Sequence, residues 1–310
     1  MTIRPQNKDK VIAVLGPGAV GGLLASLFWK NNFNVICVGT EKSVKIIKEK
    51  GLNIESAMFG NFIAKPNALL DLDKKVDILF ITTKATDLLE ALKRINSSKL
   101  ENTAIFPLLN GIEHMKILKE KFGENIIAGA ISIEVFREDI YRIIHSSPFI
   151  RIKMAHNGNL PSEIIEKIAN LLISMGIAIE VLDSELKVLW EKLVFVNALA
   201  CTTAASNKPI GWVRENMEWR KKLEGCVSEA IDVSKKEGAN FEYDIVTAMN
   251  LLDSLPTTMC TSMQRDVVNG KIPELEAIPG AIIRAGKKYN LPCPTIESLK
   301  NDIKAKLTQV

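Results

Sequence analysis

Short apolar runs of strand length alternate with stretches of helical spacing along the first part of the chain. The apolar runs are residues 11–15, 35–38, 76–81 and 103–106, and the helical stretches are residues 19–30, 88–95 and 115–121. Runs in which apolar residues follow one another, rather than alternate with polar ones, are typical of strands buried on both faces of a parallel sheet. The pattern therefore predicts an α/β fold built on a doubly wound parallel sheet.

The pattern then changes. Three strand-like pieces, residues 131–136, 141–144 and 149–154, follow one another closely and predict an antiparallel extension of the sheet. A helix at 163–174 and a last strand at 177–181 follow, and from Ser184 onward only helical spacing remains, with Asp183 or Ser184 as a helix N-cap. We therefore expect two domains, residues 1–183 with the sheet and an all-helical domain of residues 184–310.

The composition narrows the class of protein. Of 310 residues, 47% are apolar and 25% charged, which is close to the average of soluble globular proteins. The net charge of +4 suits anionic small molecules, and clustered basic residues interleaved with aromatics are not seen, so we expect no nucleic-acid partner. The five cysteines form no CxxC pair and the three histidines are scattered, so we expect neither disulfides nor a metal site.

Residues 11–29 carry no charge and resemble a signal peptide or membrane segment in composition. Pro17 and the glycines at 16, 18, 21 and 22 divide this run into a strand-length and a helix-length piece. A backbone bent there could not satisfy its polar groups in lipid. We therefore expect no membrane association and, with reduced thiols, a cytoplasmic protein.

The strongest local motif is a GxGxxG pattern made by Gly16, Pro17, Gly18, Ala19, Val20 and Gly21. Its glycines permit a tight turn, the close approach of a pyrophosphate and helix–strand packing, while the helix N-terminus supplies amide donors. With a strand before it and a helix after it, the motif predicts a Rossmann-type dinucleotide-binding domain. The alternative is a glycine-rich turn that binds another ligand.

The residues after the second strand bear on the choice between NADP and NAD, because a basic side chain favours the 2′-phosphate and an acidic one a free ribose. Thr40 can donate to a phosphate and Lys42 can neutralise it, whereas Glu41 would repel it or bind a ribose diol. The alternative is that Glu41 and Lys42 only begin a solvated helix. These residues alone leave the choice open.

Three other polar positions have structural explanations when taken alone. Lys84 follows a strand at the carboxyl edge of the sheet, where ligands of doubly wound folds lie, but spacing alone favours an ordinary surface lysine. Asn110 with Gly111 suits a turn or a helix N-cap. Glu274 suits the first turn of a helix.

Lys192 flanks an apolar stripe on a predicted helix. At ~100° per residue, one side of this helix gathers Leu186, Leu189, Trp190, Leu193, Val196 and Ala200. The ammonium either faces a groove beside the core or reaches solvent above a buried stem, and both readings stay open. Asn197 falls inside the stripe and is expected to be a hydrogen-bonded core residue.

A further helix start is predicted at residue 262. Thr261 and Gln264 fit a capping box there. The same helix start could bind a carboxylate, with Ser262 as an additional donor.

Together these segments resemble the ketopantoate reductase family (2-dehydropantoate 2-reductases) over nearly the whole chain. The matching segments are GPGAVG at 16–21, TTKATD around Lys84, LLNG ending in Asn110 and Gly111, LWEKL around Lys192, and residues 261–280. The resemblance implies reduction of 2-dehydropantoate, a small 2-oxo acid, to (R)-pantoate with NADPH, toward pantothenate and coenzyme A. By position it implies Lys192 as the catalytic lysine, Glu274 as the family's glutamate, Asn110 and Lys84 as cleft residues, and Ser262 as a substrate contact.

The residue chemistry agrees with this reaction. A 2-oxo acid under reduction needs a positive donor at its carbonyl oxygen, and a protonated Lys192 supplies one. A nearby carboxylate, Glu274, would keep the ammonium charged against desolvation.

The chain departs from the family pattern at four positions. Where family members often carry asparagines, this chain has Val196, Ala200 and Ile210, and Thr40 replaces a basic residue after the second strand. These changes leave open NADP against NAD and a paralogous dehydrogenase for another 2-oxo or hydroxy acid. A third hypothesis is a non-enzymatic dinucleotide sensor. Helical domains of this kind often dimerise, so a homodimer also stays open.

Overall fold

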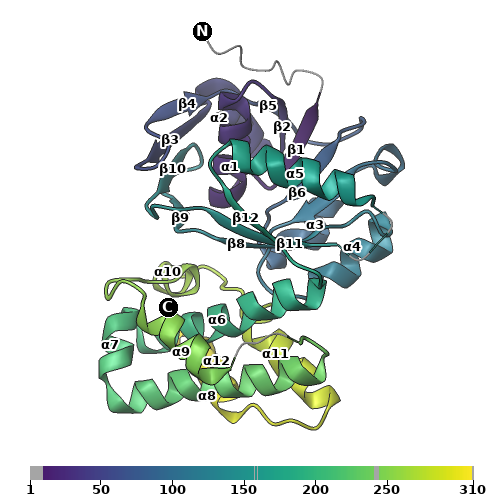
Figure 1. Cartoon of the computed structure of the whole chain (residues 1–310). Coiled ribbons are helices and arrows are strands. Elements are labelled where there is room, and N and C mark those ends of the chain that lie inside the picture. Colours follow the sequence, from purple (N-terminus) through teal and green to yellow (C-terminus); the bar gives the residue numbers. More distant parts are fainter. Residues whose placement is uncertain (1–9, 157, 159, 241–243, 309–310) are drawn as a thin grey trace. The chain divides into compact units, whose positions relative to one another are not determined.

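A computed structural model describes residues 10–156, 158, 160–240 and 244–308 of the chain (Figure 1). They form two compact units: the first runs to Leu109 and resumes at His114–Glu185, and the second holds Asn110–Glu113 and the chain from Leu186. All described strands lie in the first unit, and the described part of the second is helical. The α/β class with a parallel central sheet and a helical C-terminal part is therefore confirmed.

The central sheet of the first unit is parallel throughout, in the order β5-β2-β1-β6-β7. Its strands are β1 (Val11–Leu15), β2 (Asn34–Val38), β5 (Asn67–Leu69), β6 (Ile78–Ile81) and β7 (Ala104–Pro107). Every residue of β6 and β7 is buried, as expected for strands covered on both faces. The register sets Leu15 beside Val38, so the carboxyl ends of β1 and β2 lie side by side.

The described helices of this unit are α1 (Ala19–Lys30), α2 (Glu41–Lys50), α3 (Leu88–Leu92), α4 (His114–Phe122) and α5 (Ser162–Ser174). The uncharged run 11–29 is thus divided into β1 and α1, as predicted. The helix expected over 88–95 is shorter, because a 3₁₀ turn (Ala85–Asp87) precedes α3 and Ile95 already forms a β-bridge with Leu72.

The single strand expected over 131–136 is wrong. The chain bends between β8 (Ala128–Ser132) and β9 (Val135–Arg137). At the bend, Glu134 donates its N–H to the Ser147 hydroxyl, and its carbonyl accepts the N–H of Ser146. These bonds tie Glu134 to the segment before β11 instead of to a strand neighbour, so β8 and β9 belong to different sheets.

The antiparallel extension is confirmed only in part. β8 pairs antiparallel with β11 (Arg151–Ala155), which lies parallel to β12 (Ala178–Val181). The N–H of Ile105 in β7 donates to the Asn125 carbonyl, and the Ile105 carbonyl accepts the N–H of Ile127, both at 2.8 Å. These two bonds join the segment that enters β8 to the central sheet. A separate sheet has the order β4-β3-β10-β9, with β3 (Leu52–Ser56), β4 (Phe62–Ala64) and β10 (Arg142–His145).

The core of the first unit is centred on three phenylalanine rings from α1, β6 and β7. Phe80 packs against Phe28 and Phe106, with centroid separations of 5.4 Å in both pairs. All three side chains are fully buried. Aromatic pairs of this kind add to the stabilisation that comes from burying their area.

The second unit has its core around α6 (Glu185–Ser206). Its other described helices are α7 (Ile210–Glu215), α8 (Met217–Lys236), α9 (Ile245–Asp253), α10 (Ser262–Val268), α11 (Pro279–Lys288) and α12 (Pro294–Leu307). By length and composition α6 is apolar enough to cross a membrane, but 78% of its most apolar window is buried inside the protein. Such burial is typical of the core helix of a folded domain.

We predict that Phe80→Ala lowers the free energy of unfolding by about 3–5 kcal/mol, because it leaves a cavity between two rings. Urea denaturation followed by circular dichroism measures this. Leu89→Ala is the matched control, since Leu89 is 64% exposed, and should change stability by less than about 0.5 kcal/mol. Equal losses in the two variants would contradict this description of the core.

Candidate functional site

The glycine turn joins β1 to α1. Gly16 has a φ of 82°, and its N–H donates to the Val38 carbonyl at 2.9 Å. Gly18 is the N-cap of α1 without any side-chain cap, and a Cβ added there would meet only the Gly16 oxygen, at 3.9 Å. The first amides of α1 therefore have an open approach, which suits a phosphate group.

Two threonines that follow β6 close the turn from the other side. Thr82 Oγ1 donates to the carbonyls of Leu15 and Gly16, at 3.1 and 2.9 Å. A Cβ on Gly21 would lie 2.1 Å from Thr82 Oγ1, and one on Gly16 would lie 2.6 Å from Thr83 Cγ2, so neither position has room for a side chain.

The Thr83 hydroxyl is buried and has no hydrogen-bond partner among the described residues. A polar ligand at the turn would satisfy it. The residues present thus fit a dinucleotide. Sequence reasoning assigned no role to Thr82 or Thr83, because 66 residues separate Thr82 from Gly16 and no local pattern connects them.

The residues after β2 begin a helix, and Glu41 and Lys42 are exposed in its first turn. Thr40 is the N-cap of α2, and its hydroxyl accepts the N–H of Ser43 at 3.4 Å. The Thr40 hydroxyl is thus engaged within its own helix, whereas Lys42 is exposed. Lys84 stands directly before the 3₁₀ turn and next to Thr83, at the carboxyl end of β6.

In the helical unit, the structure brings Asn110, Lys192 and Glu274 together. Glu274 is only 8% exposed, and its Oε2 accepts a hydrogen bond from Asn110 Nδ2 at 2.9 Å. The pKa of Lys192 on α6 responds to the charge of Glu274. We call these three residues the Lys192 group.

The helix positions expected for Asn110, as an N-cap, and for Glu274, in a first helical turn, are wrong. Glu274 lies in the turn before α11, which begins only at Pro279, so it is not in the first turn of a helix. Asn110 is not a helix N-cap either, since α4 begins at His114. Gly111 has a φ of 84°, and a Cβ there would lie 2.4 Å from the Ala277 oxygen. Its missing side chain allows the backbone next to Asn110 to lie against the turn that carries Glu274.

Burial lowers the pKa of Lys192 to about 8, and the negative charge of Glu274 limits this shift. The ammonium therefore stays mostly protonated at neutral pH but releases its proton more readily than an ordinary lysine. Such a group can polarise an oxygen and transfer a proton to it. Among the described residues, no cluster of His, Cys, Asp or Glu is placed to hold a metal ion.

The start of α10 is tied to the helix that carries Lys192. The Thr261 hydroxyl accepts the N–H of Gln264 at 3.2 Å and lies 3.0 Å from the hydroxyl of Thr203 on α6. Thr203 follows Lys192 by about three turns, which returns it to the same helix face. The N-cap at Thr261 is confirmed, but the buried Gln264 Oε1 has no hydrogen-bond partner in the described part of the chain, so the second bond of the capping box is not formed. Ser262 is exposed on the first turn of α10, and its contact with substrate stays a prediction.

The positions where the family often carries asparagines are apolar and largely buried. Val196 lies one turn after Lys192 and is half-buried, while Ala200 and Ile210 are 2% and 0% exposed. Asn197 is fully buried and accepts a hydrogen bond from Cys201 Sγ at 3.4 Å, which confirms its predicted place in the core.

Family models described as "Ketopantoate reductase PanE/ApbA" and its C-terminal part match residues 12–158 and 186–307. An uncharacterized oxidoreductase, YkpB, of Bacillus subtilis is 26% identical, and the alignment covers 92% of this chain and 95% of that protein. A 2-dehydropantoate 2-reductase of Archaeoglobus fulgidus is 24% identical, with 94% and 95% covered.

Solved structures show the same fold. A D-mandelate dehydrogenase with NADH and anilino(oxo)acetate has a TM-score of 0.89 at 23% identity, over 96% of this chain and 99% of that one. A ketopantoate reductase of Ralstonia eutropha has a TM-score of 0.86 at 20% identity, with the same coverage.

We predict that the free energy of unfolding of the wild type, relative to that of Lys192→Met, depends on pH, because burial lowers the folded-state pKa of Lys192. The folded-state pKa of about 8 lies below the ordinary 10.5, so the folded protein releases this proton first. The free energy of unfolding of the wild type therefore rises, relative to that of the variant, as the pH increases from about 8 to 10.5. Urea denaturation at several pH values measures the difference. Lys236→Met, at an exposed lysine, is the control, and a difference in stability between wild type and Lys192→Met that does not change with pH would contradict the assignment.

Proposed function

The chain belongs to the ketopantoate reductase family of oxidoreductases, and from this premise we propose that it reduces 2-dehydropantoate to (R)-pantoate with NADPH. The observation that carries the proposal is the Lys192 group, in which burial lowers the pKa of Lys192, the charge of Glu274 limits that shift, and Asn110 donates a hydrogen bond to Glu274. Under this proposal the enzyme works in the cytoplasm, on the route to pantothenate and coenzyme A.

Lys192 would act at the carbonyl oxygen of the substrate. Its Nζ donates a hydrogen bond to that oxygen, polarises the carbonyl and gives up its proton as the alkoxide forms. The product then carries a hydroxyl, and the neutral amine regains a proton from solvent. A pKa of about 8 suits this cycle, because the group is charged at neutral pH and its proton is not held too tightly.

Glu274 and Asn110 help to keep Lys192 protonated. The carboxylate offsets part of the desolvation that favours the neutral amine. The Asn110 amide fixes the orientation of the carboxylate through the 2.9 Å bond to Oε2. Asn110 thus acts on Lys192 through Glu274.

The cofactor would bind at the glycine turn of the first unit. There, the open amides of α1 and the unpartnered Thr83 hydroxyl suit the pyrophosphate. When bound, the nicotinamide supplies the hydride for the carbonyl carbon. Lys42 is exposed at the start of α2 and is the residue we propose for the 2′-phosphate of NADP, with Lys84 and Thr40 in supporting places.

We predict that Lys192→Ala lowers turnover of 2-dehydropantoate by about 100- to 1,000-fold while cofactor binding stays nearly intact. The assay follows NADPH and NADH oxidation, and fluorescence titration gives the cofactor affinity. Lys236→Ala, at an exposed lysine, should behave like wild type.

The wild-type rate should also fall above about pH 8, as Lys192 loses its proton.

Near-normal turnover in Lys192→Ala would remove this lysine from the mechanism. Cofactor binding without turnover of any 2-oxo acid by the wild type would instead favour the dinucleotide-sensor hypothesis.

A second candidate is reduction of a 2-oxo acid with an apolar side chain. It is favoured by Val196, which places an apolar, half-buried surface one turn from Lys192 on nearly the same helix face. A hydroxyl on the substrate would find no polar partner at this position. The D-mandelate dehydrogenase among the structural neighbours is compatible with such a substrate.

We predict that Val196→Asn shifts kcat/KM toward 2-dehydropantoate, relative to 3,3-dimethyl-2-oxobutanoate, by about tenfold. The two acids differ only in the 4-hydroxyl, so the ratio isolates its recognition. Val246→Asn on α9, where the valine is 64% exposed, should leave the ratio unchanged. If Val196→Asn also leaves it unchanged, the side chain does not contact the substrate.

A further inference from the structure

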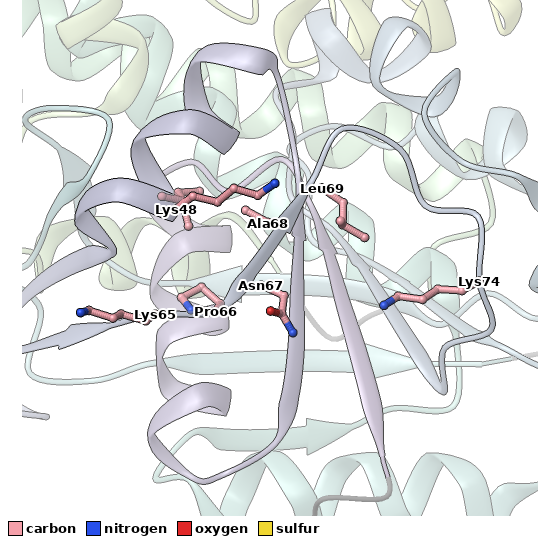
Figure 2. A pocket seen from close by; sticks show the side chains of 8 residues that line it. Lys48, Lys65, Pro66, Asn67, Ala68, Leu69 and Lys74 are labelled. Atoms are coloured by element: carbon pink, nitrogen blue, oxygen red, sulfur yellow. The ribbon is translucent and has the colours of Figure 1, made fainter.

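A second cavity of the first unit lies at the outer edge of the central sheet, between α2 and β5 (Figure 2). Its volume is about 490 Å³, within the range of small-molecule sites. It is lined by Ile47, Lys48, Lys65, Pro66, Asn67, Ala68, Leu69 and Lys74. In Figure 2 the side chains of Lys48 and Lys74 extend toward β5 from opposite sides, whereas Lys65 extends away.

The three lysines give the lining of the cavity a positive charge that no ion pair among the described residues neutralises. The described residues that line the cavity include no acidic side chain. Lysines elsewhere pair with carboxylates, as Lys119 does with Glu185 at 2.9 Å. Within the described chain no ion pair involves Lys48, Lys65 or Lys74. Like charges around one cavity repel each other, and a bound anion would relieve that repulsion.

The edge of the sheet adds neutral donors to the same cavity. β5 is an edge strand that pairs only with β2. The Leu69 carbonyl accepts the N–H of Gly39, so Leu69 turns its backbone groups toward β2. Strand alternation turns both the N–H and the carbonyl of Ala68 away from β2, and this residue is only 2% exposed. The Asn67 side chain lines the cavity as well and carries a carboxamide donor.

This cavity is separate from the glycine turn within the same unit. The turn lies at the carboxyl ends of β1 and β2, where Leu15 pairs with Val38. The cavity lies at β5, which β2 separates from β1, and it extends from Lys65 and Pro66 before β5 to Leu69, which pairs with Val38. Lys48 is ~12 Å along α2 from the N-cap Thr40. A ligand here would therefore leave the glycine turn accessible.

From these observations we infer that the edge of β5 is a second anion site, which binds a small molecule with several phosphate groups. Two ammonium groups reaching one strand edge from opposite sides match a chain of phosphates better than a single charge. The Asn67 carboxamide N–H groups add neutral donors for phosphate oxygens. No aromatic side chain lines the cavity to stack on a base, so the recognition is of the phosphates themselves.

Inorganic tripolyphosphate is the probe for this site, used in calorimetric titrations of the full chain at low ionic strength with and without saturating NADPH. We expect one tripolyphosphate per chain, bound also in the presence of NADPH and more weakly at high salt. The double variant Lys48→Gln/Lys74→Gln should weaken binding by at least about tenfold. The matched control is Lys45→Gln, at an exposed lysine on α2 that does not line the cavity.

Three results would overturn the inference. One is the absence of saturable binding by the wild-type chain. Another is loss of binding when NADPH is present, which would place the probe at the glycine turn. The last is an equal loss in Lys45→Gln and in the double variant, which would mean a diffuse attraction to surface charge.

Discussion

A lysine ammonium that is withdrawn from water must be held against an opposite charge, and in the helical unit that requirement joins three distant parts of the chain. Lys192 supplies the ammonium, and Glu274 supplies the carboxylate that limits the fall of its pKa. A buried carboxylate also needs donors, and the Asn110 amide provides one at 2.9 Å. The group therefore depends on the short segment Asn110–Glu113 folding with the helices rather than with the sheet that precedes it in sequence.

The glycine turn depends on a different constraint, the exclusion of side chains. Thr82 and Thr83 occupy the space that a Cβ at Gly21 or Gly16 would need, and Thr82 also bonds to the turn's carbonyls. Around Gly18 there is room instead. The turn is thus closed on the side of the protein and open at the helix start, which is the arrangement that lets backbone amides approach a phosphate.

Several elements were predictable because their signals are local. β1, the glycine turn and α1 follow from a continuous apolar run, the glycine spacing and helical periodicity within about twenty residues. The bend at Glu134 was not predictable, since it is stabilised by Ser146 and Ser147 from the segment between β10 and β11. The sequence pattern also did not predict the short strands β3, β4 and β5, because each depends on its partner strands more than on its own composition.

The sequence by itself determined the doubly wound sheet, the helical C-terminal part, the dinucleotide motif and the residue types that a 2-oxo acid reductase needs. Only the tertiary structure decided that Glu274 lies outside any helix and bonds to Asn110, that Thr203 holds the start of α10, and that the lysines near β5 share one cavity. The physical reason is the sequence separation over which each kind of interaction acts. Periodicity and glycine geometry act between neighbours in sequence, whereas a charge pair or a hydrogen bond across 164 residues exists only after the chain has packed.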